Sequence, residues 1–165
     1  MVDVVSAGRR SLMMAGIRGK NTKPEIEVRK ALHSLGFRFG RSNTLLPGKP
    51  DIVLPRWKVV VFVNGCFWHW HGCRFSKLPA SNKDFWFAKL STNRERDVRV
   101  LAQLTETGWR VVTIWECSLR NRQPDNTFNS EMLGVAQWIR ESPAESSFVV
   151  HGARGKNSLH DNQNN

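Results

Sequence analysis

The first apolar pattern with a clear period begins after residue 20. The segment Thr22-Lys23-Pro24-Glu25 has the form of a capping box, with proline in the first turn, where its missing N–H group costs nothing. Val28, Leu32 and Leu35 follow at helical spacing, and Gly36 is a typical residue to end a helix. The pattern predicts an amphipathic helix whose apolar stripe faces a core.

Three apolar runs farther along the chain predict strands. Residues 51–54 form a short run after turn-forming proline and glycine. Residues 58–63 and 109–115 are continuous apolar runs, the pattern of strands covered on both faces. Residues 64–81 are rich in Gly, Cys, His and Trp and have no stable period, so they predict a structured loop.

Two more helices are expected. The first runs from about residue 82 to 107, with Ser81-x-x-Asp84 as its cap and Gly108 at its end, and the second covers about residues 128–140. The apolar residues of the long helix that we expect to point toward the core are Leu90, Val98, Leu101 and Leu104. The basic residues that we expect on its outer face are Arg94, Arg96 and Arg99.

The order helix, strand pair, loop, helix, strand, helix predicts an α/β fold with a small mixed central sheet flanked by helices. At 165 residues the chain has the size of one domain, which we expect at residues 21–140. Residues 1–20 have little apolar pattern and are expected to be a basic N-terminal arm. Residues 141–165, rich in Ser, Gly, Asn and His, are expected to be a flexible C-terminal tail.

The charge of the chain narrows the class of partner. The formal net charge is +11 with a pI near 10.5, and the first fifty residues carry ten Lys or Arg against three acids. Such an excess favours a polyanion such as nucleic acid, and aromatic residues among the basic ones would serve stacking. A solvated basic surface that serves only solubility is the alternative.

The lengths of the apolar runs and the number of cysteines indicate the cellular compartment. No run approaches the roughly 18 apolar residues of a membrane span, and the first residues lack the pattern of a signal peptide. Three cysteines, an odd number, argue against a disulfide framework and leave metal ligation or plain burial. We therefore expect a cytoplasmic protein that does not enter a membrane.

The cysteines predict a metal site. Cys66, His71 and Cys73 come from one tight loop, and Cys117 lies just after the strand that ends at residue 115. Three thiolates and one imidazole make a standard closed zinc site, which would be structural because it would fix an irregular loop. Two alternatives stay open: His69 could replace His71 as fourth ligand, or the three thiols could simply be buried.

Pro50-Asp51 at the opening of a strand is similar to the Pro-Asp motif of restriction-endonuclease-like nucleases. An aspartate there can hold Mg²⁺, which prefers oxygen ligands, polarises a phosphate and lowers the pKa of a bound water. The paired strand of those nucleases usually supplies Asp/Glu-x-Lys, whereas this one ends Phe62-Val63-Asn64. The metal would then rely on Asp51, on waters and on a main-chain carbonyl, for which Val63 is the candidate.

Together these motifs resemble the very short patch repair (Vsr-type) endonucleases, which belong to the same superfamily. The resemblance covers about residues 10–140. Its motifs are Leu46-Pro47-Gly48-x-Pro50-Asp51, Phe62-x-x-Gly65-Cys66-Phe67-Trp68-His69-x-His71-x-Cys73, Phe85-Trp86, Glu95-Arg96-Asp97, Gly108-Trp109-Arg110-Val111 and Trp115-Glu116-Cys117. The resemblance implies a restriction-endonuclease-like three-layer fold. It implies an enzyme that nicks DNA at T:G mismatches left by deamination of 5-methylcytosine, on the 5′ side of the mismatched thymine.

The resemblance also implies roles for single residues. Asp51 would be the Mg²⁺ carboxylate, Val63 would offer its carbonyl, and His69 would be the general base that prepares the attacking water. The zinc ligands would be Cys66, His71, Cys73 and Cys117. The residues in contact with DNA would be Phe67, Trp68 and Trp86, which wedge into the base stack beside the mismatch, and Met14 of the basic arm. Ordinary packing of Phe67 and Trp68 is the alternative.

The implied partner is double-stranded DNA with a T:G mismatch, and mismatch-repair proteins and a repair polymerase are candidate further partners. The implied compartment is the cytoplasm of a bacterium, at the nucleoid. A nick in one strand needs a single active site, so we expect a monomer.

The sequence departs from the family at the end of the second predicted strand. Position 64 is Asn where the family often has a second active-site histidine, and position 63 is Val where Thr is common. Asn64 can hydrogen-bond a phosphate or a metal-bound water but cannot titrate, so acid–base work falls on His69. Glu25 matches an acidic position near the family's active site, and its place in the capping box explains it equally well. A catalytically weakened mismatch-binding protein and a restriction-type nuclease of the same fold are the alternative functions.

Overall fold

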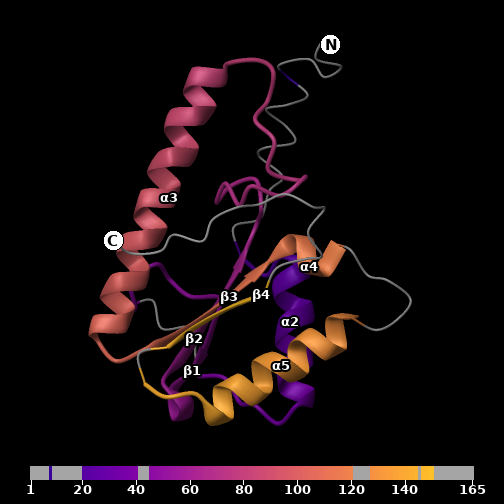
Figure 1. Cartoon of the computed structure of the whole chain (residues 1–165). Coiled ribbons are helices and arrows are strands. Elements are labelled where there is room, and N and C mark those ends of the chain that lie inside the picture. The colour runs from indigo at the N-terminus through magenta and orange to yellow at the C-terminus, as the bar shows by residue number, and fades with distance from the viewer. Residues whose placement is uncertain (1–7, 9–19, 41–44, 121–126, 145, 151–165) are drawn as a thin grey trace, which may run out of the picture.

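The computed structural model describes residues 8, 20–40, 45–120, 127–144 and 146–150 (Figure 1). Met14 and nearly all of the expected basic arm therefore lie outside the described residues, as does the chain beyond Val150. Within the described part of the chain, no helix is long and apolar enough to cross a membrane.

A four-stranded mixed sheet forms the centre of the fold, in the order β1-β2-β3-β4. β1 (Ile52–Leu54) pairs antiparallel with β2 (Val59–Asn64), from which it is separated by a single 3-10 turn. β2, β3 (Arg110–Trp115) and β4 (Ser147–Val150) run parallel to one another, and helices connect them, as parallel neighbours require. The three predicted strands are confirmed, each within one residue of its expected ends.

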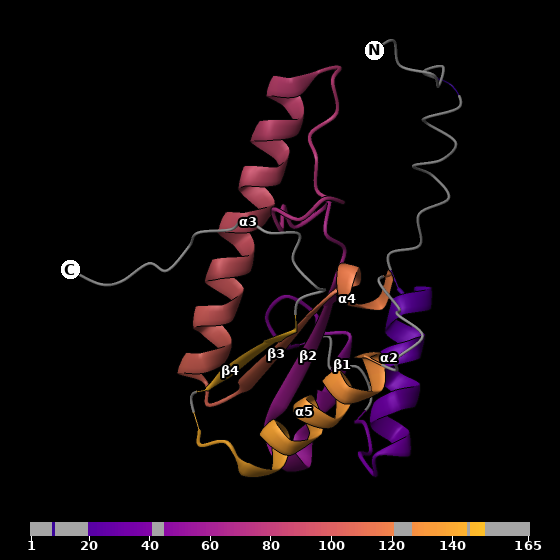
Figure 2. The same cartoon turned by 45° about the vertical axis from the view of Figure 1, so that its right-hand side comes forward.

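Helices cover both faces of the sheet and make three layers (Figures 1 and 2). α2 (Lys23–Ser34) and α5 (Thr127–Glu141) pack on one face, and α3 (Lys83–Glu106) packs on the other. A hydrophobic core lies on each face of the sheet, and successive residues of β2 point alternately into the two cores. Val61 packs in the core under α2 and α5, and Val60 packs in the core on the α3 side. The continuous apolar run is therefore buried on both faces, and the predicted α/β fold with a small mixed sheet is confirmed.

The first helix begins and ends as the sequence predicts. Thr22 is the N-cap of α2, and its hydroxyl accepts a hydrogen bond from the Glu25 N–H (3.4 Å). Val28 and Leu32 are fully buried against the sheet. Gly36 follows the helix at φ +94°, a left-handed conformation that glycine adopts without steric cost. Local sequence signals thus place Glu25 at the end of α2 that lies beside Asp51.

Three details of the prediction are wrong. The N-cap of α3 is Asn82 rather than Ser81. Val98 and Leu101 are 63% and 40% exposed, because they line a cavity beside the sheet instead of packing in the core. Residues 147–150, expected within a flexible tail, form β4, which pairs with β3 through four residues and buries Val150.

Candidate active site and metal centre

Asp51 lies directly before β1, beside the end of β2. Its Oδ2 atom accepts a hydrogen bond of 2.7 Å from the Val63 N–H, so the carboxylate is held against the strand on which the sequence analysis placed the second metal ligand. Burial raises the pKa of Asp51 to about 6. The Val63 hydrogen bond opposes this rise, the negative charge of Glu25 adds to it, and the positive charges of Arg29 and His69 oppose it. Asp51 is therefore an acid that titrates close to neutral pH.

Glu25 links the start of α2 to this aspartate. It is 5% exposed, and its carboxylate accepts hydrogen bonds from the Asn21 N–H (2.8 Å) and the Thr22 hydroxyl (2.9 Å). Arg29, one turn farther along, lies 3.9 Å from Glu25 Oε2 and donates to the Asp51 carbonyl (3.3 Å). The capping role of Glu25 is thus confirmed, and a catalytic role stays a prediction. The sequence analysis did not single out Arg29, and only its place one turn after Glu25 could have suggested it.

His69 is held by a carboxylate from α3. Its side-chain Nδ1 atom lies 2.5 Å from Asp97 Oδ2, and its main-chain N–H donates to the Gly65 carbonyl (3.2 Å). Arg96 lies 3.8 Å from the second oxygen of Asp97. When Nδ1 carries the proton that Asp97 accepts, Nε2 is the basic atom, and the ring is fixed in one orientation. The sequence analysis assigned Asp97 no chemistry, because the Glu95-Arg96-Asp97 motif does not show which loop it meets.

One cavity of about 720 Å³ brings the predicted catalytic residues together. The predicted site residues that line it are Glu25, Asp51, Val63, Asn64, Trp68 and His69. Lys20, Lys49, Arg29 and Arg96 also line it, so four cations surround the carboxylates. A carboxylate, an imidazole and a rim of cations around one cavity suit the binding and hydrolysis of a phosphodiester.

The four predicted zinc ligands converge in space. One ligand atom from each of Cys66, His71, Cys73 and Cys117 can be chosen so that all four lie within 4.8 Å of one another. Cys117 is carried by α4 (Glu116–Arg120), a short helix directly after β3 that the sequence analysis did not predict. Its N–H donates to the Cys66 sulfur (3.3 Å), and hydrogen bonding to the Cys117 side chain, together with burial, raises the pKa of the Cys66 thiol. The cluster could hold a metal ion, and its three sulfurs and one nitrogen are donors that suit zinc.

The geometry chooses between the two histidines. His71 Nδ1 lies 3.6 Å from the Cys117 sulfur, and its ring stacks on Trp115 with centroids 4.1 Å apart and planes 11° from parallel. His69 is instead paired with Asp97 and lines the cavity of Asp51. His71 therefore belongs to the metal cluster. Trp115, the last residue of β3, is the surface on which the His71 ring rests.

Phe67, Trp68 and Trp86 form one aromatic cluster. Their rings meet edge to face, with centroids 5.2 to 6.2 Å apart. Trp86 is only 8% exposed, whereas Phe67 and Trp68 are half-buried and Trp68 lines the cavity of Asp51. Asn93 of α3 donates to the Trp68 carbonyl (2.9 Å) and so fixes the loop beneath the cluster. The packing expected as the alternative is present, and insertion of these rings into DNA stays a prediction.

The chain is similar to enzymes that act on DNA. Residues 2–75 match the family described as DNA mismatch endonuclease Vsr. The DNA mismatch endonuclease Vsr of Escherichia coli is 41% identical over 92% of this chain and 97% of its own length. Type II nicking enzyme V.XorIIP of Xanthomonas oryzae pv. oryzae is 50% identical over 72% of this chain and 88% of its own. Type II nicking enzyme V.NmeAIP of Neisseria meningitidis is 44% identical over 74% and 87%.

The likeness to the Escherichia coli enzyme extends over 92% of the chain, and the three-layer architecture is the restriction-endonuclease-like fold of that family. The chain belongs to the Vsr family of DNA mismatch endonucleases.

Proposed function

We propose that the protein nicks one strand of duplex DNA at T:G mismatches that arise when 5-methylcytosine is deaminated. It cuts on the 5′ side of the mismatched thymine and so starts very short patch repair. The observation that carries the proposal is the single cavity into which Asp51, held by Val63, and His69, held by Asp97, both open. The names of the relatives, mismatch endonuclease and nicking enzyme, support the same reaction.

The residues around Asp51 fit a magnesium ion. Among the described residues, none donates a hydrogen bond to Asp51 Oδ1, so this oxygen is free to act as a ligand. The N–H and carbonyl of an extended residue point to the same side of a strand, so the Val63 carbonyl is directed toward Asp51 as its N–H is. Bound Mg²⁺ supplies polarisation of the scissile phosphate and a more acidic water. Asp51 must be ionised for this role, and its pKa of about 6 allows that at neutral pH.

His69 serves as the general base in this proposal. Asp97 accepts the Nδ1 proton, which leaves Nε2 to take a proton from the attacking water. Asp97 also stabilises the imidazolium that results, as the orienting carboxylate of a catalytic triad does. Asn64 ends β2 and lines the same cavity, where its amide can position a phosphate oxygen but cannot move a proton.

The DNA is recognised through charge and through deformation. Lys20, Lys49 and Arg96 on the cavity rim neutralise backbone phosphates and place the strand over Asp51. The half-buried rings of Phe67 and Trp68 enter the base stack beside the mismatch. A mismatched step costs less to unstack than a matched one, so the deformation favours T:G sites. The zinc ion proposed at Cys66, His71, Cys73 and Cys117 keeps this loop rigid.

The deciding experiment uses end-labelled duplexes, one matched and one with a single T:G, incubated with the protein and Mg²⁺. A nick 5′ of the thymine only in the mismatched duplex supports the proposal. Cleavage of both duplexes would point to a restriction-type nuclease, and tight T:G binding without a nick to a mismatch-binding protein weakened by Asn64. Asp51→Ala should abolish the nick and spare binding. Asp97→Asn should lower kcat roughly 100-fold or more with little change in KM.

A further inference from the structure

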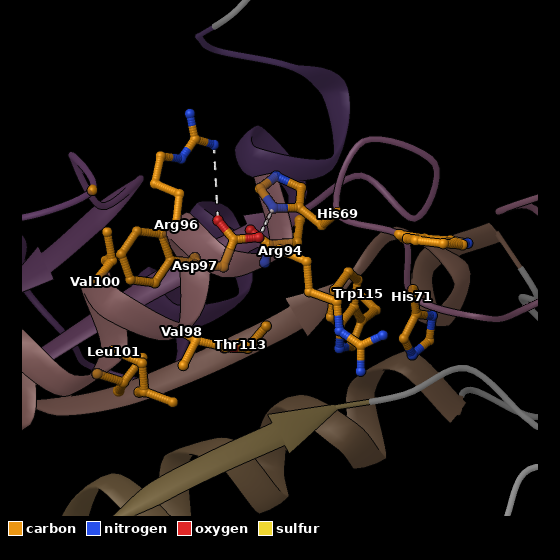
Figure 3. Close-up of a pocket in the computed structure, with 15 residues that line it drawn as sticks. His69, His71, Arg94, Arg96, Asp97, Val98, Val100, Leu101, Thr113 and Trp115 are labelled. Carbon is orange, nitrogen blue, oxygen red and sulfur yellow. Dashed lines mark hydrogen bonds and ion pairs between the residues drawn. The ribbon is translucent and has the colours of Figure 1, made fainter. Parts of the chain in front are cut away.

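A second cavity lies behind His69 and Asp97, on the α3 side of the sheet (Figure 3). Its volume is about 290 Å³, the low end of the range for small-molecule sites. It meets the cavity of Asp51 at the proposed general base, because the two cavities share five lining residues: Gly48, Phe62, Asn64, His69 and Arg96. Its remaining walls come from α3, from β3 and from the loop that carries Trp70 and His71, and none of the roles proposed above places a ligand in it.

The part of this cavity between α3 and the sheet is apolar and accessible. Val98 and Leu101 of α3 line it although they are 63% and 40% exposed. Thr113 of β3 lines it from the sheet, and its register partner Val149 on β4 is 44% exposed. α3 therefore leaves the β4 side of this sheet face uncovered. Exposed apolar surface of this kind, next to a cavity, commonly marks a binding site.

The cavity also contains a cation that forms no ion pair with the described residues. Arg94 is exposed, and within the described part of the chain no carboxylate pairs with its guanidinium. Figure 3 shows its side chain extending from α3 into the cavity toward Trp115. His71 already stacks on Trp115, so this ring is held rigidly in place. A positive charge, a fixed indole and an apolar floor thus converge on one small space.

We propose that this cavity binds a planar aromatic group that carries a negative charge, the chemistry of a nucleoside monophosphate. Arg94 pairs with the phosphate, and the base lies on the apolar floor between Val98 and Thr113. Methyl groups on the floor favour thymine over cytosine, because the thymine C5-methyl group gains apolar contact. The ligand comes either as a free nucleotide or as the terminal nucleotide of a nicked strand. The second source rests on the proposed function.

A ligand at this position touches the groups that would perform the cleavage. His69 and Asp97 both line the cavity, so an occupied cavity restricts the movement of the pair. A nucleotide held there after the nick would keep the cut end beside the enzyme. The cavity is therefore a site for retention of the product, or for inhibition by free nucleotide.

Binding can be measured without cleavage. Thymidine 5′-monophosphate, without Mg²⁺ and without DNA, is titrated into the full chain by calorimetry, with 2′-deoxycytidine 5′-monophosphate as the comparison. Arg94→Gln should weaken binding of the thymidine nucleotide roughly tenfold to a hundredfold, the loss of one charge-assisted pair. Arg99→Gln is the matched control, since Arg99 is an exposed arginine of α3 that does not line the cavity. Val98→Asp should abolish binding, and Leu133→Asp, an exposed apolar position of α5, should not.

The two sources are separated with nicked duplexes. One carries a 5′-phosphorylated thymidine at the nick, and the other carries a 5′-phosphorylated abasic analogue there. Arg94-dependent preference for the first duplex, with no binding of free nucleotide, assigns the site to the cut strand. Equal binding of the two nicked duplexes by the wild type and by Arg94→Gln would overturn the proposal. Failure to bind both the free nucleotide and the nicked duplexes would also overturn it, and would leave the apolar face to a protein partner. Nicking at T:G sites in either case would show that the proposed function stands without this site.

Discussion

Replacement of Asp51 by Asn should stabilise the protein when Mg²⁺ is absent. Burial raises the pKa of Asp51 from 3.8 to about 6, so the folded state holds the ionised form less favourably than the unfolded chain does. At about 1.4 kcal/mol per pKa unit, the ionised carboxylate lowers the free energy of unfolding by up to about 3 kcal/mol above pH 7. Asn is neutral, and its side-chain oxygen can still accept the Val63 N–H. We therefore expect Asp51→Asn to gain about 1 to 3 kcal/mol at pH 8.

The sign of this effect fixes its pH dependence. The folded-state pKa lies above the unfolded one, so the destabilisation is complete above about pH 7 and fades as the pH falls from 6 toward 4. Urea unfolding of the wild type and the variant at pH 8 and at pH 4.5 measures the difference. Added Mg²⁺ should stabilise only the wild type, because a ligand of the folded state raises its stability and the variant has lost the carboxylate.

Asp84→Asn is the matched control, because Asp84 is an exposed aspartate in the first turn of α3. Its stability should change by no more than about 0.5 kcal/mol, independently of Mg²⁺. An Asp51→Asn variant less stable than the wild type at pH 8 would refute the reasoning. So would a gain of equal size at pH 8 and pH 4.5, since burial of a charge could not then be the cause.

Three further perturbations test other parts of the site. Arg29→Gln removes a positive charge that lowers the pKa of Asp51, so the acid limb of the pH–rate profile for nicking should move to higher pH. An unchanged acid limb would mean that the ionisation of Asp51 does not control the rate. Gly48→Ala should cost about 2 to 4 kcal/mol in urea unfolding, because Gly48 has φ +70° and its Cβ would lie 2.5 Å from a methyl carbon of α3. Gly72→Ala is the control: Gly72 has φ +86° and its added Cβ would meet nothing within 4 Å, so only the strain of the left-handed backbone should lower the free energy of unfolding, by about 1 kcal/mol. Cys117→Ser should lower bound zinc, measured by elemental analysis, and cost about 2 to 5 kcal/mol; full zinc content would exclude Cys117 as a ligand.

Local signals in the sequence were enough to predict the scaffold. Thr22 marks the start of α2 by a hydrogen bond to a nearby N–H, and Gly36 marks its end by its backbone conformation. Both signals involve only nearby residues. The run of residues 58–63 predicted a strand buried on both faces because no polar side chain interrupts it. These features depend on residues a few positions apart, and a sequence displays such relations directly.

Relations between distant residues could not be predicted in the same way. Val98 and Leu101 have the spacing of a buried helical stripe, but whether they are covered depends on how far α3 extends over the sheet. β4 is only four residues long and follows a polar segment, so its local sequence gives little indication that it pairs with β3 as a strand. Burial of one face of a helix or of a short edge strand is decided by tertiary contacts.

The site shows the same limit. Asp51 was predicted from a two-residue motif and a strand, and the structure places it beside Val63. His69 and Asp97 are separated by 28 positions, so no spacing rule joins them. The choice of His71 over His69 as metal ligand likewise needed the position of Cys117.

Asn64 determines how the proposed chemistry depends on pH. Among the described residues around the Asp51 cavity, His69 is the one imidazole, because a titratable group is missing at position 64. A second histidine at the end of β2 would share proton transfer and add its own ionisation to the rate profile. With Asn64 in that place no second histidine adds its ionisation, and the ionisation of Asp51, with its pKa of about 6, should appear in the rise of activity with pH. Loss of Asp97 should lower kcat with little change in KM or in the free energy of unfolding, whereas loss of a purely structural contact would lower the stability and leave kcat of the folded enzyme in place.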